Sequence, residues 1–458
     1  MHIRKYRPDY GRRLFLERLG AGVLACGVLR PLTAAIAADG DVSRAYPDEL
    51  LSLDQLTGGR VAPGDRIDAG NVDAVRELLD PVRFHQVKHM GRVMEVVETT
   101  TDMTRLSPRA YLEATLRHRG RARFSASGNV VTDDGRPWIG GNPFPDPRNG
   151  LEIFANITLS WGRHDVSFYP IRETDIDADG RIAYTYDLVW AELAPVGRVT
   201  LEPRPYWPGH EDKLRYQSLF FVAPHDIRGT AYLNVWPYDQ RQLPELWGYL
   251  PEFKRVRRLP TNQRFEPLVP GGTLYLSDAW SAGDPLLTWG NYRVVHQGPF
   301  LAGLSGNWNA SHPDWVQGTH GGPGGATFWD TRVELVPEAI VVDAEPVAFP
   351  RAPVSRKRVW FDARTQLPLA MVTYDRRGQP FKSFDGTFSL YAQDGQRVAD
   401  GADAYWSWCN VHAHDVQSGR MSRLQQVREV AGGHAMRVND PSVYDDFLTV
   451  AALRRLGH

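Results

Sequence analysis

Short runs of β-branched and aromatic residues, separated by turn sequences, dominate the middle of the chain. Clear examples are residues 182–190, 219–222 and 230–236, and turn sequences such as Asp179-Gly180 lie between the runs. Runs of this composition between turn residues predict β-strands. The pattern therefore predicts a mainly β (α+β) fold in which tight turns join the strands.

Two stretches also predict which strands are neighbours. Residues 246–250 are followed by a proline break and a second run at 253–259. Residues 358–362, 369–374 and 380–384 are three strand-like runs joined by short turns, which predicts an antiparallel meander. The chain shows no internal repeat and no alternating strand–helix pattern, so a parallel sheet is not expected.

Helical periodicity is limited to short segments near the two ends of the mature chain. Asn71 is expected to cap one helix, and Asp440 is expected to cap a C-terminal helix with Pro441 in its first turn. The apolar residues expected on one face of each helix are Val72, Val75, Leu78 and Leu79 in the first, and Val443, Phe447, Val450 and Ala451 in the second.

Residues 298–330 are rich in glycine, tryptophan and histidine and have little periodicity. A connection of this length is either a functional flap or a packed irregular insertion. The chain has 14 tryptophans, and nine of them lie between residues 190 and 330. Core packing explains most of them, and the excess could line an apolar cavity or a cleft that stacks on sugars.

Residues 1–37 have the layout of an export signal. Basic residues precede a short apolar stretch at 19–29, and a small-residue cleavage sequence ends at Ala37. The sequence around Arg12-Arg13 resembles a twin-arginine signal, with the general secretory route as the alternative. We therefore predict a signal peptide that is cleaved after about Ala37 and a mature protein in the periplasm.

The charge balance excludes one class of partner. The chain carries 53 basic and 54 acidic residues, and removal of the predicted signal peptide leaves a net charge of −6. Nucleic acid binding would need the opposite sign. Only Cys409 then remains, so no intramolecular disulfide can form. A lipid anchor at Cys26 is the disfavoured alternative, because Leu24 fits a lipidation sequence poorly.

Two motifs imitate functional loops without their partners. Residues 320–325 (HGGPGG) resemble an oxyanion-binding loop, but the chain has no Gly-x-Ser-x-Gly sequence, which favours a mobile glycine loop. Residues 175–180 (DIDADG) resemble the start of a calcium-binding EF-hand loop. The twelfth loop position is Tyr186 instead of glutamate, so a β-hairpin turn is the preferred interpretation.

Two sets of potential metal ligands also lack the required pattern. They are Cys409, His412, His414 and Asp415, and the pair His85 and His89. A strand would turn His412 and His414 the same way, but one cysteine at this spacing matches no usual zinc site, and a buried thiol is the alternative. The sequence therefore predicts no metal, no cofactor and no catalytic residue.

Four stretches of the chain resemble a proteobacterial family of exported proteins, domain-of-unknown-function family 1329 (DUF1329). They are residues 111–115 (YLEAT), 140–145 (GGNPFP), 246–258 (LWGYLPEFKRVRR) and 358–384. The last two are also similar to the wider LolA/LolB/LppX-like group of lipoprotein and lipid carriers. The resemblance implies an open antiparallel half-barrel, curved around an apolar cavity and plugged by helices.

The same resemblance implies a function. Family members tend to be encoded beside outer-membrane barrels and RND-type exporters, which implies the handling of a hydrophobic molecule between membranes. Residues 38–458 are then expected to form one LolA-like domain with an irregular insertion at about 298–330. The side chains that we expect to line the cavity are Trp236, Trp247, Tyr249, Val256, Trp360 and Met371.

Three functions stay open on the sequence alone. The first is a periplasmic carrier or chaperone without catalysis, which binds a lipid, a lipoprotein acyl chain or a similar molecule for an envelope transport system. The second is an exported hydrolase of lipid esters or glycans. The third is an envelope scaffold that binds a membrane protein through the basic strand ends at 254–258 and 356–358 or through residues 298–330. Peripheral contact with a membrane is compatible with the first and third.

Overall fold

The computed structural model describes residues 52–267, 269–400 and 402–457. The predicted signal peptide and Cys26 lie outside the described residues, so the cleavage site and the lipid anchor stay predictions. Among the helices of the described ranges, none is long and apolar enough to cross a membrane.

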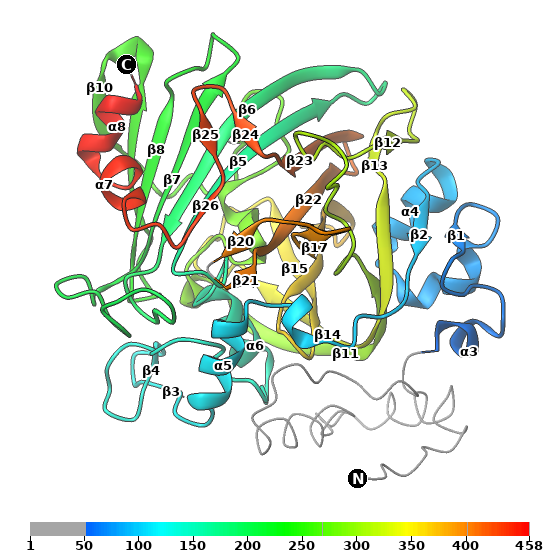
Figure 1. The fold of residues 1–458 in the computed structure, drawn as a ribbon, viewed down its shortest axis with the longest axis horizontal. Coiled ribbons are helices and arrows are strands. Elements are labelled where there is room, and N and C mark those ends of the chain that lie inside the picture. The colour runs from blue at the N-terminus through cyan, green and yellow to red at the C-terminus, as the bar shows by residue number, and fades with distance from the viewer. Residues whose placement is uncertain (1–51, 268, 401, 458) are drawn as a thin grey trace.

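One sheet of 16 strands organises the fold. In Figure 1 it curves from β1 and β2 at the right of the view to β8 and β10 at the left. Two of the 16 strands lie beside the main order: β11 pairs with β14, and β26 pairs with β5. In spatial order the strands are β1 (Arg66–Ile67), β2 (Met94–Val96), β14 (Thr331–Glu345), β15 (Val354–Asp362), β16 (Pro368–Asp375), β17 (Pro380–Leu390), β22 (Trp406–Asp415), β23 (Arg420–Gln426), β5 (Val166–Ile176), β6 (Ile182–Leu193), β7 (Lys213–Ala223), β8 (Ala231–Pro237), β9 (Glu245–Leu250) and β10 (Arg255–Leu259), with β11 (Gly290–Ala302) and β26 (Arg437–Val438) at the sides.

The sheet is mixed and does not close into a barrel. Its pairings are antiparallel except for that of β2 with β14, which is parallel. The strands at the two ends of the order, β1 and β10, each have one neighbour. The expectation of a mainly β fold with a curved, open sheet is therefore confirmed.

The predicted strand neighbours are also confirmed. β9 and β10 form a hairpin in which Tyr249 opposes Val256. β15, β16 and β17 form the meander, with Met371 opposite Val359 on one side and Phe384 on the other. The aspartate-rich sequence at 175–180 forms the β5–β6 hairpin turn, as expected.

Helices are short and few. The α-helices are α3 (Leu53–Thr57), α4 (Pro81–His89), α5 (Arg109–Arg117), α6 (Gly150–Thr158), α7 (Val443–Phe447) and α8 (Val450–Leu456), and the 3₁₀ segments used below are η3 (Val72–Leu78) and η6 (Leu276–Ser281). Asn71 is the N-cap residue as predicted, but the helix that it precedes is the 3₁₀ segment η3 and its side chain makes no cap bond. Its side-chain oxygen accepts a bond from the Asp68 N–H at 2.9 Å, so it holds the preceding turn instead of η3.

The C-terminal helix differs from the prediction as well. Two helices replace one, because the chain breaks at Leu448 and Thr449 caps α8 with a 3.0 Å bond from the Ala452 N–H. The break rotates the second helix, which buries Ala452 and leaves Ala451 exposed. The residue before the first helix is Ser442, so Asp440 does not cap it.

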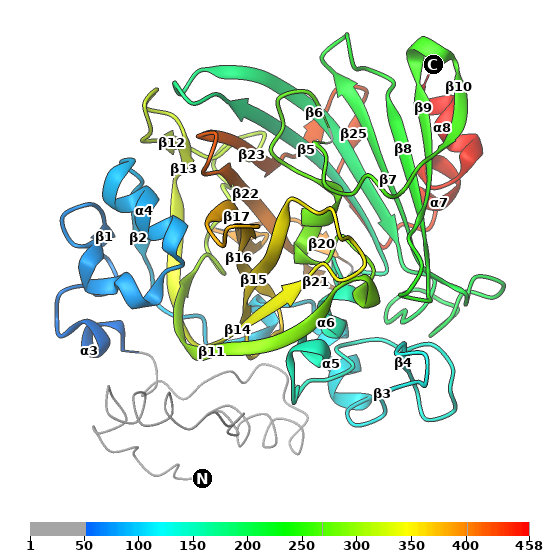
Figure 2. The same cartoon turned by 180° about the vertical axis from the view of Figure 1, so that it is seen from behind.

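The two faces of the sheet have different covers. We call the face that carries Met371, Phe384 and Ala413 the inner face, which α6 and residues 264–289 cover. The opposite, outer face carries Asp385 and His412, and α4 and the segment 303–330 cover it there. Helices α7 and α8 cover the outer face of β6 to β9, at the left of Figure 1 and the right of Figure 2.

The glycine- and tryptophan-rich segment packs against the rest of the molecule. Trp308 and Trp315 lie with their ring centres 5.2 and 5.3 Å from that of Tyr391. A Cβ atom added to Gly324 would collide with the backbone of Gly180 in the β5–β6 turn, so the two glycines allow the two loops to meet. Residues 298–302 belong to β11, and the irregular part therefore begins at residue 303.

Candidate functional site

An apolar pocket of about 140 Å³ lies between the inner face and the chain segment at 274–281. Strands β5, β6, β7, β16, β17, β22 and β23 form its floor, and η6 with its flanking residues forms its cover. The lining residues are Tyr169, Ile171, Glu173, Leu188, Trp190, Leu219, Phe221, Leu274, Tyr275, Leu276, Asp278, Ala279, Trp280, Ser281, Pro368, Leu369, Ala370, Met371, Phe384, Gly386, Phe388, Trp408, Val411 and Leu424. We call this the apolar pocket.

Strand register explains why apolar side chains gather there. Across three neighbouring strands, Ile171 opposes Leu188, and Leu188 opposes Phe221. Side chains two residues apart on a strand share a face, so the next rung, which includes Trp190, turns the same way. The even spacing of large apolar residues along β5, β6 and β7 therefore produces one continuous apolar floor.

Several floor residues keep accessible surface although they lie in the middle of the sheet. Trp190, Val411 and Leu424 are only half-buried, and so is Trp280 in the cover. Large apolar side chains at such central positions are normally fully buried. Their remaining surface faces the pocket, so the pocket is accessible space and not a gap closed by packing.

Two buried lysines hold the cover on the sheet. The Lys382 Nζ donates to the Asp278 carboxylate and to the Thr273 carbonyl, both at 2.7 Å. The Lys357 Nζ donates to the Ser281 carbonyl at 2.6 Å. Burial lowers the pKa of Lys357 to about 8. These bonds fix both ends of η6 over the pocket.

One carboxyl group stands among the apolar lining. Glu173 is 5% exposed, and its Oε1 has no hydrogen-bond partner among the described residues. Burial and the neighbouring Asp175 carboxylate raise the pKa of Glu173 to about 8. The Ser422 hydroxyl donates its hydrogen bond to Asp175 and not to Glu173. At neutral pH Glu173 is therefore mainly protonated and can donate a hydrogen bond into the pocket.

The sequence analysis missed Glu173, although a signal was present. Tyr169, Ile171 and Glu173 are spaced two apart just before the predicted hairpin turn at 175–180, so a strand there places the carboxyl on the same face as two large apolar residues. An acid on an apolar strand face is a candidate for a perturbed pKa and for a functional role.

Of the six predicted lining residues, Met371 lies in the lining of the apolar pocket. Trp236 belongs to an adjacent aromatic cluster, where its ring centre is 5.5 Å from that of Trp161. Trp161 in turn lies 5.9 Å from Trp190, which does line the pocket. Trp236 is therefore two rings away from the pocket.

The other four predicted residues lie on the outer face. Trp247, Tyr249 and Val256 pack with the cluster that α7 and α8 cover. Trp360 stacks on Phe300 of β11, with ring centres 5.7 Å apart. Whether any of the six binds a ligand stays a prediction.

The potential metal ligands on β22 have other partners. The His412 Nε2 accepts the Trp329 N–H at 2.8 Å, and the His414 ring lies 3.0 Å from the Gln86 amide. Burial raises the pKa of the Cys409 thiol to about 12. Within residues 52–267, 269–400 and 402–457, no group of three or more His, Cys, Asp or Glu side chains is placed to hold a metal ion.

Comparison with known proteins gives a family match over most of the chain. The family model described as "Protein of unknown function (DUF1329)" matches residues 66–454. A curated protein of Pseudomonas aeruginosa, "Uncharacterized protein PA3922", is 28% identical over 197 residues, which are 42% of this chain. The match spans about two fifths of that relative, 41% of its length.

Solved structures of similar proteins cover about two thirds of the chain. One is the "putative outer membrane lipoprotein-sorting protein domain" from Vibrio parahaemolyticus. It is 19% identical to this chain, the match covers 67% of this chain and 98% of that chain, and the TM-score is 0.42. A DUF1329 family protein from Desulfovibrio piger is 15% identical. The match covers 66% of this chain and 97% of that chain, and the TM-score is 0.43. A LolA superfamily protein from Nitrosomonas europaea is 10% identical. The match covers 62% of this chain and 94% of that chain, and the TM-score is 0.36.

Proposed function

The chain belongs to the DUF1329 family, and from that premise we propose that it is a carrier without catalytic activity that binds a hydrophobic molecule in the apolar pocket. The observation that carries the proposal is the accessible apolar surface of Trp190, Val411 and Leu424 beneath the cover. Apolar surface that stays open to solvent inside a fold gains free energy when a ligand covers it, at about 25 cal/mol per Å².

The size of the pocket limits what fits without movement. Pockets for drug-sized ligands usually measure about 300–1,000 Å³, and a dry cavity near 150 Å³ holds one benzene-sized molecule. A pocket of about 140 Å³ accepts one ring or a short part of an alkyl chain. A longer acyl chain or a terpenoid therefore requires displacement of the cover at 274–281.

Glu173 gives the pocket one polar contact. Its protonated carboxyl supports a ligand with a hydroxyl or carbonyl oxygen, because that oxygen could accept a hydrogen bond from the carboxyl, whose Oε1 has no partner in the described part of the chain. Small numbers of placed polar groups in an otherwise apolar pocket set ligand orientation.

The setting proposed for this carrier is the periplasm. The support is the export-signal pattern of residues 1–37 and the resemblance described above. The cargo is a lipid, a lipoprotein acyl chain or a similar molecule, and the partners are an outer-membrane barrel and an RND-type transporter.

Native mass spectrometry of the protein purified from the periplasm without detergent tests the proposal. A stoichiometric lipid or terpenoid that is released by solvent extraction is the expected result. If the chain carries no such molecule, titration with the fluorescent probe 1-N-phenylnaphthylamine is the second measurement. Saturable one-to-one binding is expected, and failure of both measurements contradicts the carrier.

A matched pair of variants locates the binding. Val411→Trp places an indole inside the pocket, and Val295→Trp makes the same change at an exposed position on β11. We expect the first variant to lose at least tenfold in probe affinity and the second to retain it. Equal affinities in both variants would place the ligand elsewhere.

A further inference from the structure

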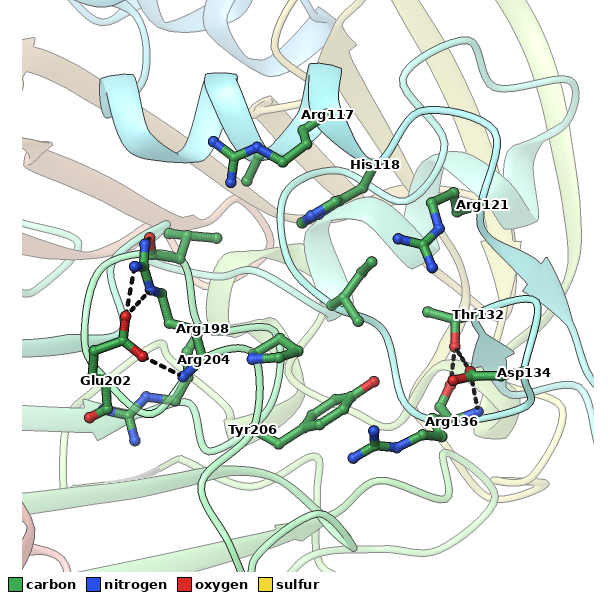
Figure 3. A pocket seen from close by; sticks show the side chains of 14 residues that line it. Arg117, His118, Arg121, Thr132, Asp134, Arg136, Arg198, Glu202, Arg204 and Tyr206 are labelled. Atoms are coloured by element: carbon green, nitrogen blue, oxygen red, sulfur yellow. Dashed lines mark hydrogen bonds and ion pairs between the residues drawn. The ribbon is translucent and has the colours of Figure 1, made fainter.

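A second pocket, of about 470 Å³, lies outside the sheet and is rich in arginine. The end of α5, the turn at 132–136 and the loop at 198–206 surround it, as Figure 3 shows. Its charged lining comprises Arg117, Arg121, Arg136, Arg198 and Arg204 against Asp134 and Glu202. We call it the arginine pocket.

The two carboxylates of the arginine pocket are already engaged. Glu202 forms an ion pair with Arg204, with 2.6 Å between the Glu202 Oε1 and the Arg204 Nη2. Asp134 accepts bonds from the Thr132 hydroxyl and, at 3.1 Å, from the Arg136 backbone N–H. Among the described residues, the guanidinium groups of Arg117 and Arg136 form no ion pair within 4.0 Å, although the Arg136 charge, after the Thr132 hydrogen bond, helps to lower the pKa of Asp134. The pocket therefore has an excess of positive charge in a chain whose net charge is −1.

Arg198 is the second, independent observation. It is 6% exposed, and its Nε has no hydrogen-bond partner within the described part of the chain. Its Nη2 reaches only the Glu202 carbonyl, at 3.3 Å. A buried guanidinium with an unused donor is costly unless a ligand supplies the acceptor. Arg198 lines the pocket, so its poorly compensated positive charge favours an anion bound there.

The shape of the pocket adds an apolar wall. Ile139, Val199 and Pro205 line it together with Tyr206, whose ring carries the Arg136 guanidinium at 4.2 Å. A ligand with both an anionic group and a carbon skeleton would use both kinds of surface. The volume lies in the range of about 300–1,000 Å³ that is typical of small-molecule sites.

We propose that the arginine pocket binds the phosphate group of an organic phosphate. Guanidinium groups match phosphate oxygens with paired hydrogen bonds, and a phosphate monoester or a diphosphate carries the multiple negative charge that balances this excess. The phosphate belongs to a soluble phosphate ester or to a lipid headgroup, which offer the same chemistry. The site shares no lining residue with the apolar pocket, so it does not rest on the proposed carrier function.

Pyrophosphate is the probe for the first measurement, by isothermal titration calorimetry with the mature protein at low ionic strength. Saturable binding at one site is expected, weakened at least tenfold by Arg117→Gln and by Arg136→Gln. Arg117 at the end of α5 and Arg136 on Tyr206 could also stabilise the fold. Binding affinity, not stability, is therefore the readout, in variants whose circular dichroism matches the parent protein.

Arg181→Gln is the matched control, because Arg181 is exposed on the β5–β6 turn, 76% by side chain, and outside both pockets. It should leave the affinity for pyrophosphate unchanged. An equal loss in the control, no loss in the two pocket variants, or no saturable binding by the parent protein would each overturn the proposal.

Competition then identifies the source of the phosphate. Displacement of pyrophosphate by glycerol 3-phosphate supports a soluble phosphate ester. Displacement by dihexanoylphosphatidic acid below its micelle concentration, with none by glycerol 3-phosphate, supports a lipid headgroup. Each competitor is tested up to 10 times the pyrophosphate concentration that half-saturates the site. If neither competitor displaces pyrophosphate in that range, the assignment to organic phosphates is overturned.

Discussion

Glu173 on β5 and Leu424 on β23 are paired across neighbouring strands, and both side chains line the apolar pocket. The pair places a carboxyl group beside an accessible apolar side chain. Burial opposes ionisation of that carboxyl, and the nearby Asp175 adds a like charge. The polar contact of the pocket is thus a neutral donor near pH 7 and becomes an anion at higher pH.

This environment predicts a pH dependence of stability. The folded chain holds the Glu173 proton up to about pH 8, whereas the unfolded chain releases it near the ordinary value of 4.5. The folded state therefore binds more protons between these values, and its stability falls as the pH rises. Glu173→Gln should weaken this fall and stabilise the protein at pH 8 by about 1 kcal/mol or more.

Urea unfolding at pH values from 5 to 8 measures the effect. Glu113→Gln, at an exposed position on α5, is the control and should keep the parent pH dependence. Asp175 remains in both variants, and its pKa is raised to about 6 by burial. Some fall with pH therefore persists. Identical curves for the two variants would show that Glu173 ionises normally.

A buried ion network on the outer face predicts a large loss of stability. Asp385 bonds to Arg83 and to Arg92, each at 2.5 Å, and its side chain is 8% exposed. Asp385→Asn would leave the buried Arg92 guanidinium without a paired carboxylate and Arg83 with Asp80 alone, at 3.4 Å, which costs about 3–5 kcal/mol. The free energy of unfolding in guanidinium chloride measures this cost.

The Lys88–Asp73 pair provides the contrast. Its N···O distance is 2.7 Å, but the Asp73 side chain is 58% exposed. Asp73→Asn should therefore cost much less stability than Asp385→Asn. Comparable losses at Asp385 and Asp73 would mean that the buried network is hydrated and carries no special weight.

The meander at 358–384 was predictable because it combines local strand periodicity with short turns, and both signals lie within one stretch of sequence. The sheet face on which the lining residues lie was not predictable from such local signals. The resemblance leads us to expect Trp247, Tyr249 and Val256 in the cavity, but they lie on the outer face. Their face depends on α7 and α8, which follow almost 200 residues later.

The buried polar contacts between distant parts of the chain could not be predicted from the sequence either. Arg83 meets Asp385 across 302 positions of sequence, and no local pattern marks either residue as a partner of the other. The two resemblance stretches 111–115 and 140–145 are instead physically linked. Asn142 accepts the Tyr111 hydroxyl at 2.8 Å, and its N–H donates to the Thr115 hydroxyl at 2.9 Å.

That junction predicts an effect at Gly141. Its φ is +76°, and a Cβ atom there would collide with the backbone of Thr115. Gly141→Ala should destabilise the protein by more than about 2 kcal/mol, because steric collision adds to the 1–2 kcal/mol of a left-handed conformation. Gly135→Ala, at φ +81° with open space around it, should cost about 1 kcal/mol. Thermal unfolding distinguishes the two, and equal losses would mean that the junction adjusts.

The contact between Lys382 and Asp278 predicts how the cover of the apolar pocket opens. The ion pair is 2.7 Å long and buried, with side chains 1% and 4% exposed, and it joins β17 to η6. Lys382→Met removes the charge and the bond to the Thr273 carbonyl while it keeps the length of the side chain. Asp278 is then left buried without its cation, so local opening of the segment should become easier.

Hydrogen exchange of the amides at 274–281 reports that opening. We expect their exchange in Lys382→Met to accelerate at least tenfold, and the apolar probe to enter and leave faster. Lys88→Met removes an exposed lysine–aspartate pair of the same length and should change neither rate. Unchanged exchange at 274–281 in Lys382→Met would show that Lys357 and the apolar contacts of Trp280 are enough to hold the cover in place.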